Sequence, residues 1–203
     1  MALAYRLVFW FCLVALAWGD GNAPLLLERL RAMDVTHHWL AGLARIDWQT
    51  GDPDPAQTPH QKTSTHCSAF VASAGQRLGI YILRPPQHKA SFLASAQQDW
   101  LNSSEGREAG WQRLEDAREA RDQANQGLFV VASWRNPVPN KPGHIAIVIP
   151  SEWSDEQLER EGCEIMQAGR SNFLSASLRQ GFANHPGAFE NAEIQFHAHS
   201  TDF

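Results

Sequence analysis

Apolar residues recur at helical spacing most clearly over residues 65–78. A helix over this segment places Phe70 and Leu78 on one apolar face. Ser64 or Thr65 is available as its N-cap, and Gly79 is well placed to end it. We therefore predict an amphipathic helix over residues 65–78.

Weaker patterns predict further helices and one irregular stretch. An imperfect helical period over residues 25–43, interrupted near residue 35, predicts two short helices. Residues 92–100 and 116–125 predict two more, the second stopped by Gly127. The charge run 105–122 is interpreted as the solvated face of a helix. Residues 51–59 contain three prolines and predict a surface loop.

After Gly127 the pattern changes to short runs rich in branched apolar residues. We predict strands over residues 128–134, 144–149, 164–168 and 192–199. Helices come first and strands follow, so we expect an α+β fold in which N-terminal helices pack on a small antiparallel sheet. The length fits one domain over residues 23–203.

The first 22 residues have the layout of a signal peptide. One positive charge, Arg6, precedes about a dozen apolar residues and a stretch of small residues, so we expect cleavage between Ala17 and Ala23. The run is shorter than the roughly 20 residues of a spanning helix, so we expect no stable membrane span after leader removal. A signal anchor or a buried N-terminal helix are the alternatives. The prediction is export to the periplasm or secretion.

Composition narrows the range of partners. The formal net charge is −5 and no basic run occurs, which argues against nucleic acid as a partner. We expect a monomer. Nine histidines invite a metal hypothesis, but none of the candidate pairs has a third ligand at a recognised spacing, so no metal and no other cofactor is expected. These pairs are His37 with His38, His60 with His66, and His197 with His199.

Two cysteines remain after leader removal, Cys67 and Cys163. In an oxidising compartment they could form one structural disulfide. Cys67 falls in the first turn of the predicted helix, where unpaired amides and the helix dipole stabilise a thiolate. His144 opens the strand 144–149 after a permissive Pro142-Gly143 pair, so it can face that helix as a base. We predict Cys67 as nucleophile and His144 as its base, and burial for Cys163.

Polar residues around this pair suggest the remaining roles. Gln167 lies on the next predicted strand, where hairpin pairing brings it beside His144 as the third catalytic residue, with Asn172 in reserve. The amide of Cys67 is the expected oxyanion donor, with Gln61 as a second. Two further residues, His66 and Trp48, are candidates for contacting substrate in the groove.

Four segments resemble one known family. They are residues 65–70 (Thr-His-Cys-Ser-Ala-Phe), 124–131, 142–148 (Pro-Gly-His-Ile-Ala-Ile-Val) and 165–169 (Ile-Met-Gln-Ala-Gly), and the similarity spans residues 63–172. They look like the NlpC-like and CHAP amidase branches of the papain-fold cysteine peptidases. In this chain His66 stands where many relatives have Asp, and Gln167 makes the third residue neutral.

The resemblance implies a papain-like fold and cleavage of amide bonds in peptidoglycan peptides, with Cys67, His144 and Gln167 as the catalytic residues. Two alternatives stay open. One is acyl transfer from a Cys67 thioester to an amine or alcohol. The other is a non-catalytic wall-binding module in which Cys67 and Cys163 are bonded.

Overall fold

The computed structural model describes residues 22–56 and 64–203, so the predicted signal peptide, apart from Asn22, and Gln61 lie outside the described residues. Within these ranges no helix is long and apolar enough to span a membrane. The helices are α1 (Asn22–Arg31), α2 (Cys67–Arg77), α3 (Leu93–Leu101), α4 (Ser104–Glu108), α5 (Ala117–Asn125), α6 (Asp155–Glu161) and α7 (Leu178–Gly181). The strands are β1 (Gln112–Leu114), β2 (Phe129–Trp134), β3 (His144–Val148), β4 (Glu164–Gln167), β5 (Phe173–Ser177) and β6 (Gln195–His199).

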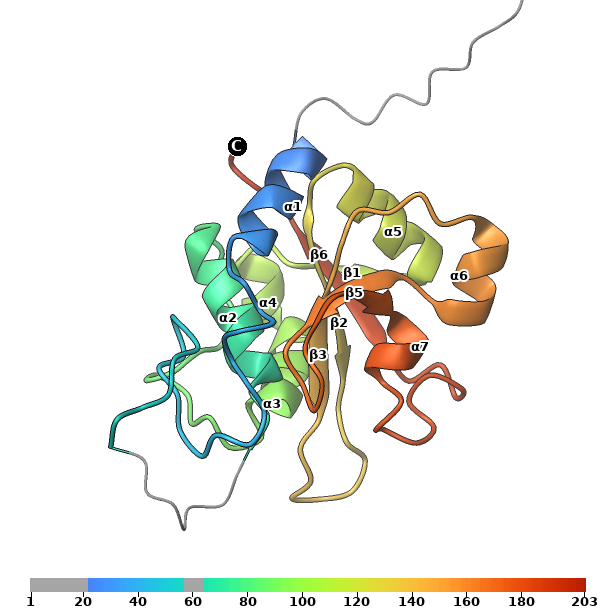
Figure 1. Cartoon of the computed structure of the whole chain (residues 1–203). Coiled ribbons are helices and arrows are strands. Elements are labelled where there is room, and N and C mark those ends of the chain that lie inside the picture. The colour runs from blue at the N-terminus through green and yellow to red at the C-terminus, as the bar shows by residue number, and fades with distance from the viewer. Residues whose placement is uncertain (1–21, 57–63) are drawn as a thin grey trace, which may run out of the picture.

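The six strands form one antiparallel sheet in the order β1-β6-β2-β3-β4-β5. Helices α1 to α4 lie on one side of it and α5 to α7 on the other (Figure 1). The α+β prediction is confirmed, with one difference. The later helices alternate with strands and cover the second face of the sheet, which the prediction left uncovered. Strands β2 and β3 are therefore buried on both faces.

The alternation of side chains along β3 separates two apolar cores. Ile145 and Ile147 join the core beneath α2, whereas Ala146 and Val148 join the core beneath α5 and α7. A residue on β3 or β4 therefore faces one helical layer or the other according to its parity. This parity decides where the polar side chains of the candidate site point.

Helix α2 packs its small and apolar residues against β3, with Phe70 fully buried. Its predicted N-cap is wrong. The helix begins at Cys67, so Ser64 and Thr65 lie too early, and His66 holds the cap position without a side-chain hydrogen bond. Gly79, with φ +75°, follows its end as predicted, in a conformation that glycine adopts without a Cβ clash.

Two helix predictions are corrected. Residues 25–43 contain only α1, because the backbone turns through positive φ at Asp34 and again at Trp39. At the second turn Trp39 packs closely on Gly51, where an added Cβ would lie 2.5 Å from the indole. The charge run 105–122 is not one helix, since it contains most of α4, all of β1 and part of α5.

Candidate active site

His144 is the first residue of β3 and is almost completely buried, with 4% of its surface exposed. Gly143 positions it: a Cβ there would lie 2.3 Å from the carbonyl oxygen of Trp134, so only glycine allows the two strands to approach this closely. By strand parity the imidazole lies on the α7 face of the sheet. There it packs edge-on against Phe182, with ring centroids 4.7 Å apart.

Gln167 ends β4 and holds His144 through one hydrogen bond. The ladder between β3 and β4 pairs Ile147 with Met166, and this register places Gln167 opposite Ala146, two residues from His144 on the same face of the sheet. His144 Nε2 and Gln167 Oε1 are 2.8 Å apart. The predicted approach of Gln167 to His144 through antiparallel strand pairing is confirmed, although the connection between the two strands contains α6 and is not a hairpin turn.

A hydrogen bond from Gln167 to the main chain indicates which nitrogen of His144 carries the proton. Gln167 Nε2 donates to the carbonyl oxygen of Ser171 at 3.1 Å, so the amide oxygen of Gln167 must face the imidazole. That oxygen can only accept, and His144 Nε2 therefore carries the proton. The lone pair of a neutral His144 then lies on Nδ1, which is the nitrogen left to take a proton from a nucleophile.

Two glycines leave room for this arrangement. A Cβ at Gly181 would lie 2.7 Å from Gln167 Oε1 and 2.3 Å from the Cδ1 atom of Ile165. A Cβ at Gly169 would lie 3.1 Å from Gln167 Nε2 and 3.4 Å from Cε1 of His144. The side chain of Gln167 is thus enclosed by backbone on two sides, which restricts it to the orientation that serves His144.

Cys67 opens α2 as predicted, but its environment differs from the expectation of a resting thiolate. Only 5% of the residue is exposed and it belongs to the apolar core beneath α2. Burial raises the pKa of the thiol, and hydrogen bonding from the backbone of Ile145, Ser68 and Cys67 itself opposes this only in part. Desolvation outweighs the helix N-terminus, so the thiol is protonated at rest.

The contact with Ile145 locates the sulfur relative to the base. Ile145 directly follows His144, so the thiol reaches the sheet at the beginning of β3. Burial lowers the pKa of His144 to about 4, although its bond to Gln167 acts in the opposite direction. In the described part of the chain no hydrogen bond joins Cys67 directly to His144. At rest both groups are neutral and both lie near the beginning of β3, the thiol in the core beneath α2 and the imidazole against Phe182 on the α7 face.

Cys163 occupies the other core and has a different environment. Its sulfur donates to the carbonyl oxygen of Ala117 at 3.0 Å, and burial raises its pKa to about 12. Both Cys67 and Cys163 are free thiols in the described structure. The predicted burial of Cys163 is confirmed, and the disulfide of the wall-binding alternative is absent from the described residues.

Two of the predicted groove residues serve the scaffold. His66 is buried, and its Nε2 lies 3.1 Å from the carbonyl oxygen of Leu43, so its contact with substrate stays a prediction. Trp48 is half buried against the core beneath α2, and its carbonyl oxygen accepts from the indole of Trp39 at 3.0 Å. Gln61 lies outside the described residues.

Asn172 also has a structural position and does not contact His144. Its Nδ2 donates to the carbonyl oxygens of Val35 and His38 at 2.6 and 2.9 Å, and its Oδ1 accepts from the amide of Gly169. It joins the segment after α1 to the β4–β5 turn. Gln167, and not the reserve candidate Asn172, is the partner of the imidazole.

Sequence reasoning missed His185. Its ring stacks on His144 with centroids 4.9 Å apart and an interplanar angle of 25°. It lies in the turns that follow α7, where no periodic pattern exists to predict a position, and a histidine between an asparagine and a proline gives no signal of its own. Only the three-dimensional path of the chain brings it to the site.

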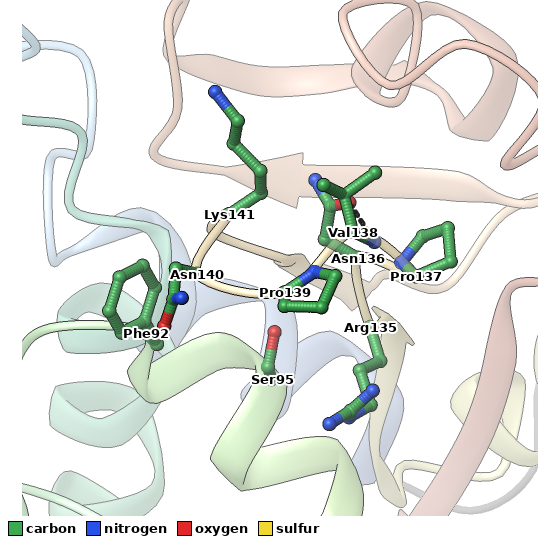
Figure 2. Close-up of a pocket in the computed structure, with 9 residues that line it drawn as sticks. All are labelled: Phe92, Ser95, Arg135, Asn136, Pro137, Val138, Pro139, Asn140 and Lys141. Carbon is green, nitrogen blue, oxygen red and sulfur yellow. Dashed lines mark hydrogen bonds between the residues drawn. The ribbon is translucent and has the colours of Figure 1, made fainter.

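A pocket of about 240 Å³ lies beneath the β2–β3 connection, next to the start of β3 (Figure 2). The Oγ of Ser95 is buried there without a hydrogen-bond partner among the described residues, and a Cβ at Gly143 would lie 2.7 Å from it. The pocket is therefore adjacent to the residue that precedes His144. Its lining residues are Phe92, Ser95, Arg135, Asn136, Pro137, Val138, Pro139, Asn140 and Lys141.

Two histidine pairs of the metal hypothesis lie within the described residues, whereas His60 of the third pair lies outside them. His37 and His38 contact different carboxylates, those of Asp34 and Asp52. His197 is completely buried in β6, whereas the ring of His199 lies 2.9 Å from the carbonyl oxygen of Ala109. Over residues 22–56 and 64–203 no group of three or more His, Cys, Asp or Glu side chains could hold a metal ion.

Comparison with known proteins found no match, either to a family model or to a curated protein.

Proposed function

We propose that this chain is an exported papain-like cysteine hydrolase that cleaves amide bonds, with peptidoglycan peptides as its substrate class. The observation that carries the proposal is the hydrogen bond between His144 and Gln167 at the strand end that the thiol of Cys67 reaches. A protonated Nε2 leaves Nδ1 to accept a proton, as a general base requires. The substrate class rests on the resemblance of residues 63–172 to NlpC-like and CHAP amidases.

The neutral resting pair sets the order of proton transfer. Nδ1 of His144 takes the thiol proton as Cys67 Sγ forms a bond to the substrate carbonyl carbon, whose π electrons move to oxygen. The imidazolium then gives that proton to the departing amine as the carbon–nitrogen bond breaks and a thioester remains. Water attacks the thioester and gives a proton to His144 as base; the carbon–sulfur bond breaks, and the released thiolate takes that proton from the imidazolium. No proton is left over at the end of the cycle.

Two groups stabilise the charges that form during this cycle. Gln167 Oε1 accepts from Nε2, and this bond strengthens when the imidazole becomes positive. The backbone amide of Cys67, at the beginning of α2, is the donor for the oxyanion, because first-turn amides have no partner within the helix. Neither group needs to move during the reaction.

Digestion of purified peptidoglycan by the mature protein tests the proposal. Released fragments are analysed by mass, and Cys67→Ala is compared with Cys163→Ala as a matched control that also removes one buried thiol. We expect new amine and carboxyl ends with wild type and with the control, and none with Cys67→Ala. Products from Cys67→Ala at the wild-type rate would falsify the assignment of the nucleophile.

Thiol labelling supplies a second measurement that needs no substrate. Iodoacetamide followed by peptide mapping compares Cys67 with Cys163 in the folded protein. We expect Cys67 to react first, because 5% of Cys67 is exposed whereas Cys163 is completely buried. Labelling of neither thiol in the native state contradicts a nucleophile at position 67. Added amines that appear in the products indicate acyl transfer in place of hydrolysis.

A further inference from the structure

His185 covers the imidazole of His144 on the side of the turns after α7. Their rings are close to parallel at 4.9 Å, and the ring of Phe182 meets that of His185 at 6.2 Å. His185 also packs against Trp134, and their ring centroids are 5.0 Å apart. Trp134 is itself fixed, because its Nε1 donates to a carboxylate oxygen of Glu193 at 2.8 Å. A half-buried histidine is thus held between two anchored rings.

Ring contacts hold the imidazole of His185 in this place, while its backbone amide donates to the carbonyl oxygen of Phe182 at 2.8 Å. Within the described structure neither nitrogen of its ring makes a hydrogen bond, in contrast to Nε2 of His144. Stacking of two imidazoles is favourable when both are neutral, whereas two imidazolium rings at this separation repel each other. The contact therefore opposes a positive charge on His144 when His185 is protonated.

Few other charges face this pair. The carboxylate of Glu193 reaches it only through Trp134, and the guanidinium of Arg170 is tied to Asn184, the residue before His185, at 3.5 Å. Helix α7 contributes Phe182, and β4 contributes the uncharged Gln167. His185 is therefore the titratable side chain in direct ring contact with the base.

We propose that His185 is a positioning residue for His144, which holds the imidazole against Gln167 while neutral and suppresses the reaction when protonated. This inference rests on the proposed function and adds an acid-sensitive control to it. The reaction needs a transient positive charge on His144, and a second cation at 4.9 Å opposes that charge. Burial lowers the pKa of His185 below its ordinary 6.5, so the suppression sets in on the acid side of neutrality.

The size of the effect follows from the ring separation. Two unit charges 4.9 Å apart, one of them partly exposed to solvent, oppose imidazolium formation by a factor of roughly 10 to 100 in rate. Activity should thus fall by that factor as His185 becomes protonated. His144 itself, with a pKa of about 4, is still neutral over most of this range.

The experiment compares His185→Phe, which keeps a stacked ring without a charge, with His185→Ala, which removes both. His37→Ala is the matched control, since that imidazole is 77% exposed and lies far from the site in the sequence. For each protein kcat is measured against pH, and the ring of His144 is titrated by NMR without substrate. The second measurement does not depend on catalysis.

We expect His185→Phe to lose the acid decline and His185→Ala to lower kcat roughly 10- to 100-fold near neutral pH, because an unsupported ring loses its alignment. The pKa of His144 should rise in both variants. Superimposed pH profiles for wild type and His185→Phe, or an unchanged His144 titration, overturn the proposal. A wild-type protein without hydrolytic activity refutes the proposed function, and the NMR titration then decides alone whether His185 controls His144.

Discussion

Replacing Gln167 by alanine tests whether its hydrogen bond keeps the proton of His144 on Nε2. The substitution removes the oxygen that accepts from His144 Nε2 at 2.8 Å and leaves that N–H buried without a partner. A stranded buried donor costs about 1–3 kcal/mol. The ring can avoid this cost only by moving its proton to Nδ1, and a protonated Nδ1 cannot accept from a thiol.

Either outcome slows the reaction. At about 1.4 kcal/mol for each factor of ten, the loss corresponds to a rate roughly 5- to 150-fold lower. The effect should appear in kcat and leave KM almost unchanged, because the bond strengthens as the imidazolium forms. The pKa of His144 should also fall below about 4, since the bond to Gln167 raises it at present.

Steady-state hydrolysis and nitrogen NMR of labelled imidazole measure the two effects separately. Gln112→Ala, which removes an exposed glutamine from β1, is the matched control. The reasoning is wrong if Gln167→Ala retains kcat within about twofold and the proton stays on Nε2. In that case the bond seen in the structure does not determine the tautomer.

Three further predictions concern stability and packing. His197 is fully buried with a pKa of about 4, so between about pH 6.5 and 4 it binds fewer protons in the folded than in the unfolded state. The free energy of unfolding of the wild type should therefore fall by about 1.4 kcal/mol for each pH unit as the pH falls through this range. Urea titrations of His197→Leu should show a pH dependence that lacks this contribution. Asn172→Ala should lower the free energy of unfolding by about 1–3 kcal/mol, because buried carbonyls lose their donor, while the His144 tautomer seen by NMR stays unchanged. Gly181→Ala should displace Gln167 and lower kcat as Gln167→Ala does; full activity in this variant contradicts the packing.

Local pattern was enough to predict the elements that carry the candidate site. The helix predicted over 65–78 is observed as Cys67–Arg77, and the strand 144–149 as His144–Val148. The helix has a strong apolar periodicity, and the strand has a strong boundary signal at its start. The alternation of side chains along a strand then restricts which residues of two neighbouring strands share a face. The pairing of Gln167 with His144 could therefore be predicted without coordinates.

Properties that depend on tertiary packing could not be predicted. A first-turn cysteine can be exposed or buried, and only the docking of α2 on β3 decides that Cys67 has a raised pKa. The sequence does not show which partner the imidazole of His66 has, because the carbonyl oxygen of Leu43 that it contacts is far away along the chain. His185 reaches His144 through turns that have no repeating pattern.

The carbonyl of Ser171, which orients Gln167, has one more consequence. A main-chain oxygen is present whatever side chain evolution places at that position, so the location of the proton on the base is inherited from the path of the backbone. Genetic drift at position 171 should therefore leave this arrangement intact. Insertions or deletions in the β4–β5 turn, by contrast, should erase it even when every catalytic side chain is retained.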